Sequence, residues 1–354
     1  MRTFFTGKEN ITQDSDAFVI AEIGNNHQGE RDICLKMMKK ANNCGANAVK
    51  LQKKNNKTLY TSKLYNSPYE NDNSFGRTYG EHKEVLELPL DDWIALKEFA
   101  DHNGILLFAT AFDIESAYFL EKLDMPLYKI ASGCMTDFPL IETIASFGKP
   151  MIISTGGWAY HHIDRLHELL KELKAEFAFL HCIASYPNKI EEMNLNIIAD
   201  MMERYPKTII GLSDHHSSVK TAIFAYFKGA RIIEKHFTLS RAWKGPDHSF
   251  SLEPKGLETL CEDIKDARLS LGKNEKVRLD SEQKPITKMS KAIYAVHRLK
   301  AGEAITESNI AIKIPGEGLE PYHVDEIIGK VVNTDVETEQ PLTASMFNDY
   351  STEV

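Results

Sequence analysis

Residues 18–52 read FVIAEIGNNHQGERDICLKMMKKANNCGANAVKLQ and contain the first unit of a pattern from which the fold can be inferred. The apolar run Phe18–Gly24 predicts a buried strand. Apolar side chains recur at helical spacing within Arg31–Asn43, and Gly45 follows as a stop signal. The run Ala48–Gln52 predicts a second buried strand. A strand, a helix and a strand in this order are typical of a parallel βαβ unit.

The same pattern continues along the chain, so that eight predicted strands alternate with eight predicted helices. The predicted strands are Phe18–Gly24, Ala48–Gln52, Leu106–Phe112, Tyr128–Ser132, Met151–Gly156, Phe177–Pro187, Ile209–His215 and Ile232–Phe237. The predicted helices are Arg31–Asn43, Asp91–His102 with Asp91 as N-cap, Ile114–Leu123, Pro139–Phe147, Ile163–Leu173, Leu195–Arg204, Ser218–Lys228 and Pro254–Leu271. Eight such units in roughly 250 residues match the size of a (β/α)₈ TIM barrel.

The composition is that of a globular protein, with 42% hydrophobic and 26% charged residues. A net charge of −9 argues against nucleic acid as the main partner. No apolar run approaches the ~20 residues that span a bilayer, and the N-terminal stretch lacks the apolar core of a signal peptide. The five cysteines form no CxxC pair, so reduced thiols are expected. We therefore expect a cytoplasmic protein with no membrane or nucleic-acid partner.

Three segments fall outside the alternating pattern. Residues 53–90 form the longest irregular stretch inside the barrel, which indicates either a functional loop or an ordered surface insertion. Residues 273–291 are charged and are interpreted as a linker. Residues 292–354 contain short strands and glycine turns, and predict a small, mainly β module that packs on something else.

Polar side chains stand at the C-terminal ends of the predicted strands, where the active site of a (β/α)₈ barrel lies. Lys50 and Lys129 would be costly to bury there without an anion. His215 and His236 end neighbouring strands; two imidazoles suit a divalent metal, although two hydrogen-bonded core histidines would leave the same pattern. Glu22 is either an acid–base group or an ion-pair partner of Lys50. We interpret the chain as an enzyme that holds an anion and a metal.

The strand ends and loops carry a series of motifs in a fixed order: AEIGNNHQG, VKLQ, YKIASG, FGKPMIISTG, LHCIASYP, GLSDH, EKHFT and KGPDHSFSLEP. Together they resemble the sialic acid synthase family over nearly the whole chain. The resemblance implies a (β/α)₈ barrel at residues 1–272, a linker at 273–291 and a mainly β antifreeze-like (SAF, β-clip) domain at 292–354. It also implies a homodimer in which each small domain closes the barrel of its partner.

The resemblance implies condensation of phosphoenolpyruvate with N-acetylmannosamine, or a close N-acylated hexose, and water. The products would be N-acetylneuraminate or a related nonulosonic acid and phosphate, with Mn²⁺ as the typical metal. His215 and His236 are the implied metal ligands. The predicted catalytic residues are Glu22, Lys50, Lys129, Glu234 and His236. The predicted substrate-binding residues are Gln52, Thr110, Ser132, Ser154, Ser185, Tyr186, Ser213 and Asp247.

Three positions depart from the family pattern and leave the acceptor sugar open. Cys134 stands where bacterial members often have an acid, with Asp137 three residues on; Ser185 lies where some members offer an asparagine. Ile314 stands where many bacterial members carry an arginine that reaches the acyl group of the sugar in a partner subunit. Legionaminic or pseudaminic acid synthesis, or use of mannosamine 6-phosphate, are alternatives within the class. Alternatives of other classes are a degenerate carbohydrate-binding protein and an aldolase with a Schiff base on Lys129.

Overall fold

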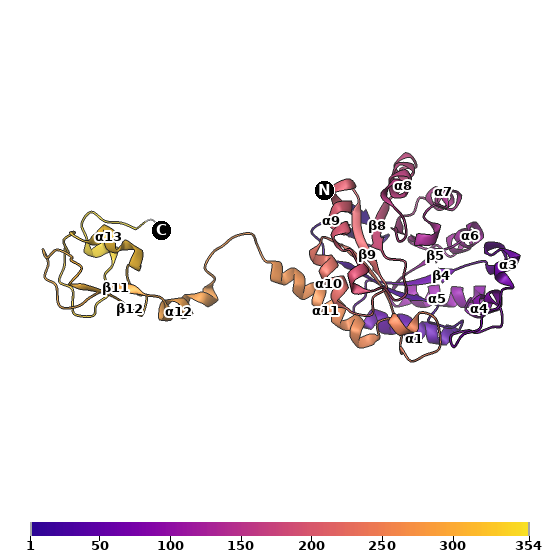
Figure 1. Cartoon of the computed structure of the whole chain (residues 1–354), viewed down its shortest axis with the longest axis horizontal. Helices are drawn as coiled ribbons and strands as arrows, with labels where there is room; N and C mark the ends of the chain where they lie inside the picture. The colour runs from indigo at the N-terminus through magenta and orange to yellow at the C-terminus, as the bar shows by residue number, and fades with distance from the viewer. Residues whose placement is uncertain (1, 353–354) are drawn as a thin grey trace. The chain divides into compact units, whose positions relative to one another are not determined.

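The computed structural model describes residues 2–352 and divides into two compact units, one ending at Gly272 and the other beginning at Lys273. The first unit is a closed barrel of eight parallel strands with helices around it (Figure 1). The predicted (β/α)₈ barrel is therefore confirmed. No helix among the described residues combines the length and the apolar character that crossing a membrane requires.

The barrel strands follow one another around the barrel in sequence order, and the last pairs with the first. They are β3 (Phe18–Gly24), β4 (Ala48–Lys53), β5 (Leu106–Ala111), β6 (Tyr128–Ile130), β7 (Met151–Ser154), β8 (Phe177–Cys182), β9 (Ile209–Asp214) and β10 (Ile232–His236). Three predicted strands were too long by two residues or more: Ser132–Cys134 form a 3₁₀ turn after β6, β7 ends at Ser154 rather than Gly156, and residues 183–187 form a loop after β8.

Helices that follow the strands surround the barrel. They are α1 (Arg31–Asn43), α5 (Leu90–His102), α6 (Ile114–Lys122), α7 (Phe138–Ser146), α8 (Tyr160–Glu172), α9 (Asn196–Arg204), α10 (Lys220–Phe227) and α11 (Pro254–Leu271). The prediction of Asp91 as an N-cap was wrong, because Pro89 takes that position and Asp91 lies in the first turn of α5. A carboxylate there still favours the helix, since it faces the positive end of the helix dipole.

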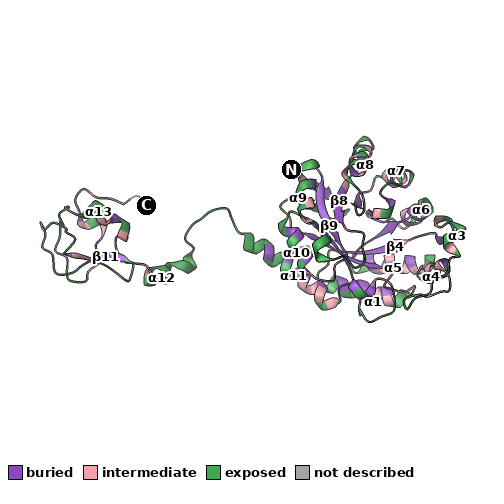
Figure 2. Ribbon diagram, in the orientation of Figure 1, coloured by how far each residue is buried: buried purple, intermediate pink, exposed green. Residues whose placement is uncertain are grey.

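The barrel strands direct alternate side chains into the barrel and toward the helices. On β3, Phe18 and Ile20 belong to the interior cluster, whereas Val19 and Ala21 pack beneath the helices. Figure 2 shows the strands as the buried centre of this unit. Glu22 continues the interior series, so its carboxylate enters the barrel. Side chains alternate in the same way on the other strands. A set of buried polar residues therefore also faces the barrel interior: Lys50, Thr110, Lys129, Ser154, Ser213, Glu234 and His236.

A short antiparallel hairpin precedes the barrel, and no sequence pattern predicted it. Its strands are β1 (Thr3–Phe5) and β2 (Asn10–Thr12). Phe4 and Ile11 join the interior cluster of the barrel, so the hairpin supplies part of the core below the strands. Three-residue strands are too short for an alternating pattern to be recognised.

The sequence indicated that the long segment after β4 is irregular. The structure shows three short helices within it. They are α2 (Asn56–Leu59), α3 (Ser62–Tyr65) and α4 (Tyr79–Val85). Thr78 and Glu81 form a reciprocal capping box that fixes the start of α4. Capping therefore holds this loop in place next to the C-terminal end of β4.

The second unit contains a helix and a small antiparallel strand pair. Helix α12 (Asp280–Met289) lies within the segment predicted as a linker. Strands β11 (Ala292–Ala295) and β12 (Ile310–Lys313) pair with each other, and α13 (Val324–Ile327) follows. A separate apolar cluster that includes Ile293, Leu299 and Phe347 forms the core of this unit.

Candidate active site

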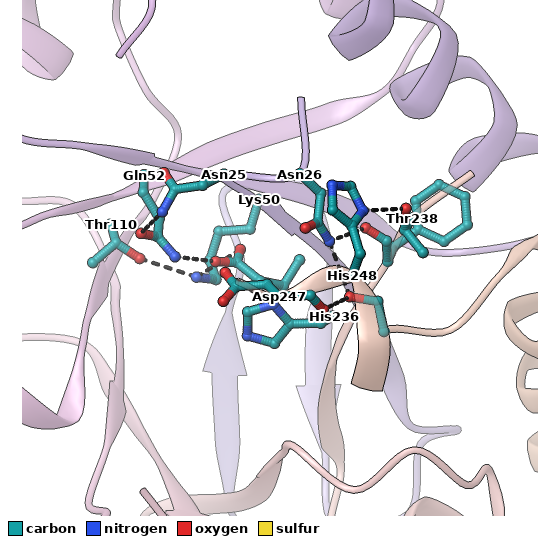
Figure 3. A network of polar contacts seen from close by, with 12 residues as sticks. Asn25, Asn26, Lys50, Gln52, Thr110, His236, Thr238, Asp247 and His248 are labelled. Carbon is teal, nitrogen blue, oxygen red and sulfur yellow. Dashed lines mark hydrogen bonds and ion pairs between the residues drawn. The ribbon is translucent and has the colours of Figure 1, made fainter. Parts of the chain in front are cut away.

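Strand register brings polar side chains from across the sequence to one level at the C-terminal end of the barrel. His236 lies opposite Glu22, Glu22 lies opposite Lys50, and Thr110 lies opposite Lys129. Figure 3 shows Lys50 and Thr110 in contact, with His236 beside them. Side chains that are up to 214 positions apart in the chain (Glu22 to His236) therefore face one space.

Lys50 is held by acidic and hydroxyl groups inside the barrel. Its Nζ lies 2.8 Å from Glu22 Oε2, 3.7 Å from Glu234 Oε1 and 3.0 Å from Thr110 Oγ1. The alternative role of Glu22 as an ion-pair partner of Lys50 is thus present in the structure. Gln52, two residues further along β4, donates to Glu22 Oε1 at 2.8 Å.

Lys129 approaches the same carboxylate from the other side. Its Nζ lies 3.9 Å from Glu234 Oε1 and donates to Ser154 Oγ at 2.5 Å. Ser213 Oγ donates to Glu234 Oε1 at 3.3 Å. Two buried ammonium groups from different strands therefore converge on Glu234, with hydroxyl donors around them.

The two carboxylates differ in electrostatic environment. Burial raises the pKa of Glu22 above its usual range, although Lys50 acts against the rise. Burial acts on Glu234 in the same direction, but Lys129 and Lys50 outweigh it, so the pKa of Glu234 is lowered. Glu22 is thus the better proton donor of the pair and Glu234 the better permanent anion.

The predicted metal ligands lie side by side, with ring centroids 5.5 Å apart. His215 Nδ1 lies 2.9 Å from the Ile183 carbonyl, which leaves Nε2 for a ligand. His236 Nδ1 is buried, finds no hydrogen-bond partner among the described residues, and lies 3.9 Å from Asp247 Oδ2. Burial lowers the pKa of His215 to about 4 and that of His236 to about 3, so both rings are neutral at pH 7.

These residues fit a divalent metal, since the orphaned His236 nitrogen is the kind of buried atom that a metal ion satisfies. Within residues 2–352 no group of three or more histidine, cysteine, aspartate or glutamate side chains is arranged to hold one. The protein would therefore supply two imidazoles, and water or substrate oxygens would complete the coordination.

Of the loop residues predicted to contact the sugar, Tyr186 and Asp247 lie beside the two histidines, whereas the Ser185 hydroxyl is bonded within its own loop. The Tyr186 ring packs 4.1 Å from the His215 ring and is 57% exposed, so it borders the site. Asp247 lies beside His236 (Figure 3). The Ser185 hydroxyl instead donates to the Pro187 carbonyl at 3.2 Å, within its own loop.

The turn after β6 holds Ser132 and Cys134. Ser132 Oγ accepts a hydrogen bond from the Gly156 amide at 2.9 Å. Burial raises the pKa of the Cys134 thiol to about 11, so it stays uncharged at neutral pH. Asp137, the nearest acid in sequence, accepts from the Leu140 amide as the N-cap of α7. Neither Cys134 nor Asp137 supplies a free carboxylate at this turn.

Sequence reasoning missed Lys54, which is buried and donates to Gln52 Oε1 at 2.8 Å. Asn25 also donates to this oxygen, at 3.4 Å. A signal for Lys54 was present, because it continues the inward-facing series of Lys50 and Gln52 on β4. The prediction ended this strand at Gln52 and assigned the following residues to a loop.

Comparison with known proteins identifies relatives of both units. A model of the NeuB family matches residues 37–276, and a model of the SAF domain matches residues 290–348. N-acetylneuraminate-9-phosphate synthase of Homo sapiens is 33% identical over 339 residues, 95% of this chain and 94% of that protein. Pseudaminic acid synthase of Campylobacter jejuni is 33% identical over 346 residues, 96% of this chain and 98% of that protein. The crystal structure of N-acetylneuraminic acid synthetase from Leptospira borgpetersenii has a TM-score of 0.70 and 31% identity, and the match covers 80% of this chain and 95% of that one.

The barrel with its buried polar strand ends, taken with these relatives, places the chain among sialic acid synthase-type enzymes. The chain belongs to the NeuB family, and its second unit contains a SAF domain. The resemblance inferred from the motifs is therefore confirmed, as is the predicted combination of a TIM barrel with a small SAF domain.

Proposed function

We propose that the chain condenses phosphoenolpyruvate with an N-acylmannosamine-type sugar and water, giving a nonulosonic acid and phosphate. N-acetylmannosamine is the proposed acceptor and N-acetylneuraminate the corresponding product. The relatives named above are synthases of N-acetylneuraminate 9-phosphate and of pseudaminic acid, which supports a synthase of this kind. Because both relatives are 33% identical to the chain, identity alone does not choose between their products.

The observation that carries this proposal is the convergence of Lys50 and Lys129 on Glu234, 3.7 and 3.9 Å away, inside a buried barrel. A substrate with a carboxylate and a phosphate can be bound by both ammonium groups and by the hydroxyls of Thr110 and Ser154. Such fixed charges also stabilise the phosphate as it leaves, without reorganising during the reaction.

The residues support the following sequence of steps. C3 of phosphoenolpyruvate attacks the aldehyde carbon, and Glu22 donates a proton to the developing alkoxide. Water adds to C2 and gives one proton back to the Glu22 carboxylate; the C2–O bond then breaks, the C2 hydroxyl proton leaves with the phosphate as the keto group forms, and Lys50 and Lys129 hold the phosphate. Glu234 stays ionised between the lysines and orients the incoming water. His215 and His236 would hold a divalent metal, with Mn²⁺ the proposed ion, which polarises the aldehyde as a Lewis acid when bound.

Release of inorganic phosphate tests this proposal directly. The full chain is incubated with phosphoenolpyruvate and Mn²⁺, with or without N-acetylmannosamine or its 6-phosphate. We expect phosphate release only when the metal and an acceptor are both present, because C–O cleavage follows carbon–carbon bond formation. Release without any acceptor, or no release with either sugar, would contradict the proposed function.

We further propose that the chain acts as a homodimer in which the SAF-containing unit of one subunit contributes to acceptor binding in the other. This unit exposes apolar side chains at Ile312, Ile314 and Tyr322, which are 50%, 56% and 72% exposed, as a docking surface would. Deleting the residues after Lys291 should raise KM for the acceptor at least tenfold and leave a folded barrel. Circular dichroism checks the fold and steady-state kinetics the KM; unchanged turnover and KM would contradict this role.

A further inference from the structure

A buried ion pair lies on the outer side of the barrel wall, directly behind the two proposed metal ligands. Lys235 of β10 and Asp214 of β9 are each 1% exposed and stand opposite each other in the strand register, with Nζ 2.9 Å from Oδ2. Each residue immediately precedes a proposed ligand, His236 or His215. Because side chains alternate along a strand, the ion pair faces the helices while both imidazoles face the interior. The pair therefore adjoins the ligands through the backbone without entering the site.

The Lys235 ammonium group joins β10 to the segment that follows His215. Besides contacting Asp214, its Nζ donates to the carbonyls of His216 and Ser218, the latter at 3.1 Å. These three acceptors use all three N–H groups of the ammonium ion. The hydrogen bonds therefore fix the chain on the C-terminal side of His215 against β10, the strand that ends in the other proposed ligand.

The Asp214 carboxylate fixes the same segment from its N-terminal side. Its Oδ1 accepts a hydrogen bond from the His216 amide at 2.8 Å, and its Oδ2 accepts one from Thr221 Oγ1, at the start of α10, at 2.5 Å. The ring of His215 is oriented separately, because its Nδ1 donates to the Ile183 carbonyl at 2.9 Å. The backbone on both sides of His215 and the ring itself are thus held by contacts within the chain.

Packing alone does not explain an ion pair at these two positions. Two residues earlier on the same strands, the outward-facing register partners are Leu212 and Ile233, both buried in the apolar layer beneath the helices. An apolar pair could fill the next outward positions as well, since replacing a buried ion pair by apolar side chains of similar volume is often neutral or stabilising. An apolar pair cannot supply the directional hydrogen bonds to the segment after β9. These bonds are therefore the distinctive contribution of Lys235 and Asp214.

We infer that Lys235 and Asp214 are positioning residues that hold His215 and His236 at the spacing and orientation that a divalent metal requires. This inference rests on the proposed function, in which the two histidines are metal ligands. Their ring centroids are 5.5 Å apart, close to the ~4.8 Å between neighbouring strands, so the spacing of the imidazoles follows that of β9 and β10 at this level. Because a metal site must keep its ligand distances within about 0.2 Å, a small displacement of either strand end should weaken binding.

Titration of the full chain with Mn²⁺, with the free ion measured by electron paramagnetic resonance, tests this inference without relying on activity. Lys235→Met and Asp214→Asn should each lower the Mn²⁺ affinity by about 10–100-fold, as is typical for loss of an outer-shell partner. The visible absorption of bound Co²⁺, which reports the coordination geometry, should change in both variants. Tyr128→Phe is the matched control, because it removes a buried outward-facing hydrogen bond from β6 to Glu121 of α6, 2.7 Å long. This control should bind Mn²⁺ as the wild type does.

A double variant separates positioning from stability. Lys235→Met/Asp214→Leu replaces the pair by apolar side chains, so its melting temperature, followed by circular dichroism, should equal or exceed that of either single variant, whereas its Mn²⁺ affinity should stay low. Wild-type Mn²⁺ affinity in the folded single or double variants would overturn the inference and leave the proposed function standing, because the pair would then only stabilise the barrel. Absence of Mn²⁺ binding by the wild type would contradict the proposed metal site, and the inference would fall with it.

Discussion

Replacing Lys129 by methionine is expected to lower kcat/KM for phosphoenolpyruvate by about 10³-fold. An effect of this size is typical when an enzyme loses a preorganised donor to the charge that develops in the transition state, here on the leaving phosphate. Lys129 Nζ approaches Glu234 and Ser154 and points into the anion site. Methionine keeps most of the side-chain volume, and Lys50 still faces Glu234 at 3.7 Å, so no buried carboxylate is left without a cation. The fold should therefore survive while turnover is lost.

Two comparisons make the Lys129→Met result specific. Lys149 lies just before β7, at the N-terminal end of the barrel strands and away from the proposed site, where it pairs with Asp124. The Lys149→Met variant should therefore retain wild-type turnover. Thermal unfolding of both variants shows whether the barrel persists. Borohydride treatment with pyruvate should give no covalent adduct on Lys129, because the proposed reaction forms no imine. Trapping of an adduct, or full activity of Lys129→Met, would contradict the assigned role.

The barrel and the inner part of the site were predictable because both follow from one periodicity. Alternation on each strand determines which side chains face inward, and parallel register then places the C-terminal ends at one level. Lys50, Lys129 and Glu234 could thus be assigned to a common space from the sequence. His215 and His236 followed in the same way, since β9 and β10 are neighbours.

The loop residues could not be placed in this way, because their side-chain directions depend on local turns rather than on strand register. The Ser185 hydroxyl donates to the Pro187 carbonyl within its own loop. Cys134 lies in a 3₁₀ turn that begins where β6 was expected to continue. Helix α4 begins at the Thr78–Glu81 capping box, within a segment that had no recognisable strand or helix periodicity. Loop geometry of this kind requires a structure, and loops carry the predicted contacts to the acceptor sugar.

Replacing His236 by alanine is expected to weaken Mn²⁺ binding by about 10²-fold or more and to reduce turnover in proportion. Loss even of an outer-shell partner typically costs 10–100-fold in metal affinity, and His236 is proposed to be one of only two protein ligands. Its Nδ1 is buried without a hydrogen-bond partner among the described residues, so substitution removes no hydrogen bond of that atom. Electron paramagnetic resonance titration of free Mn²⁺ measures the affinity without relying on activity.

The neighbouring histidine provides the matched control for this prediction. His216 Nδ1 accepts from the Ser218 amide at 3.1 Å, a role that an asparagine side chain can reproduce, so His216→Asn should bind Mn²⁺ as the wild type does. Chelator treatment of the wild type should abolish phosphate release, and added Mn²⁺ should restore it. Equal Mn²⁺ affinity in His236→Ala and wild type would mean that the two imidazoles are hydrogen-bonding core histidines. The polarisation of the aldehyde would then have to come from Glu22 and the lysines, because they are the proton donor and the cations that remain at this level of the barrel.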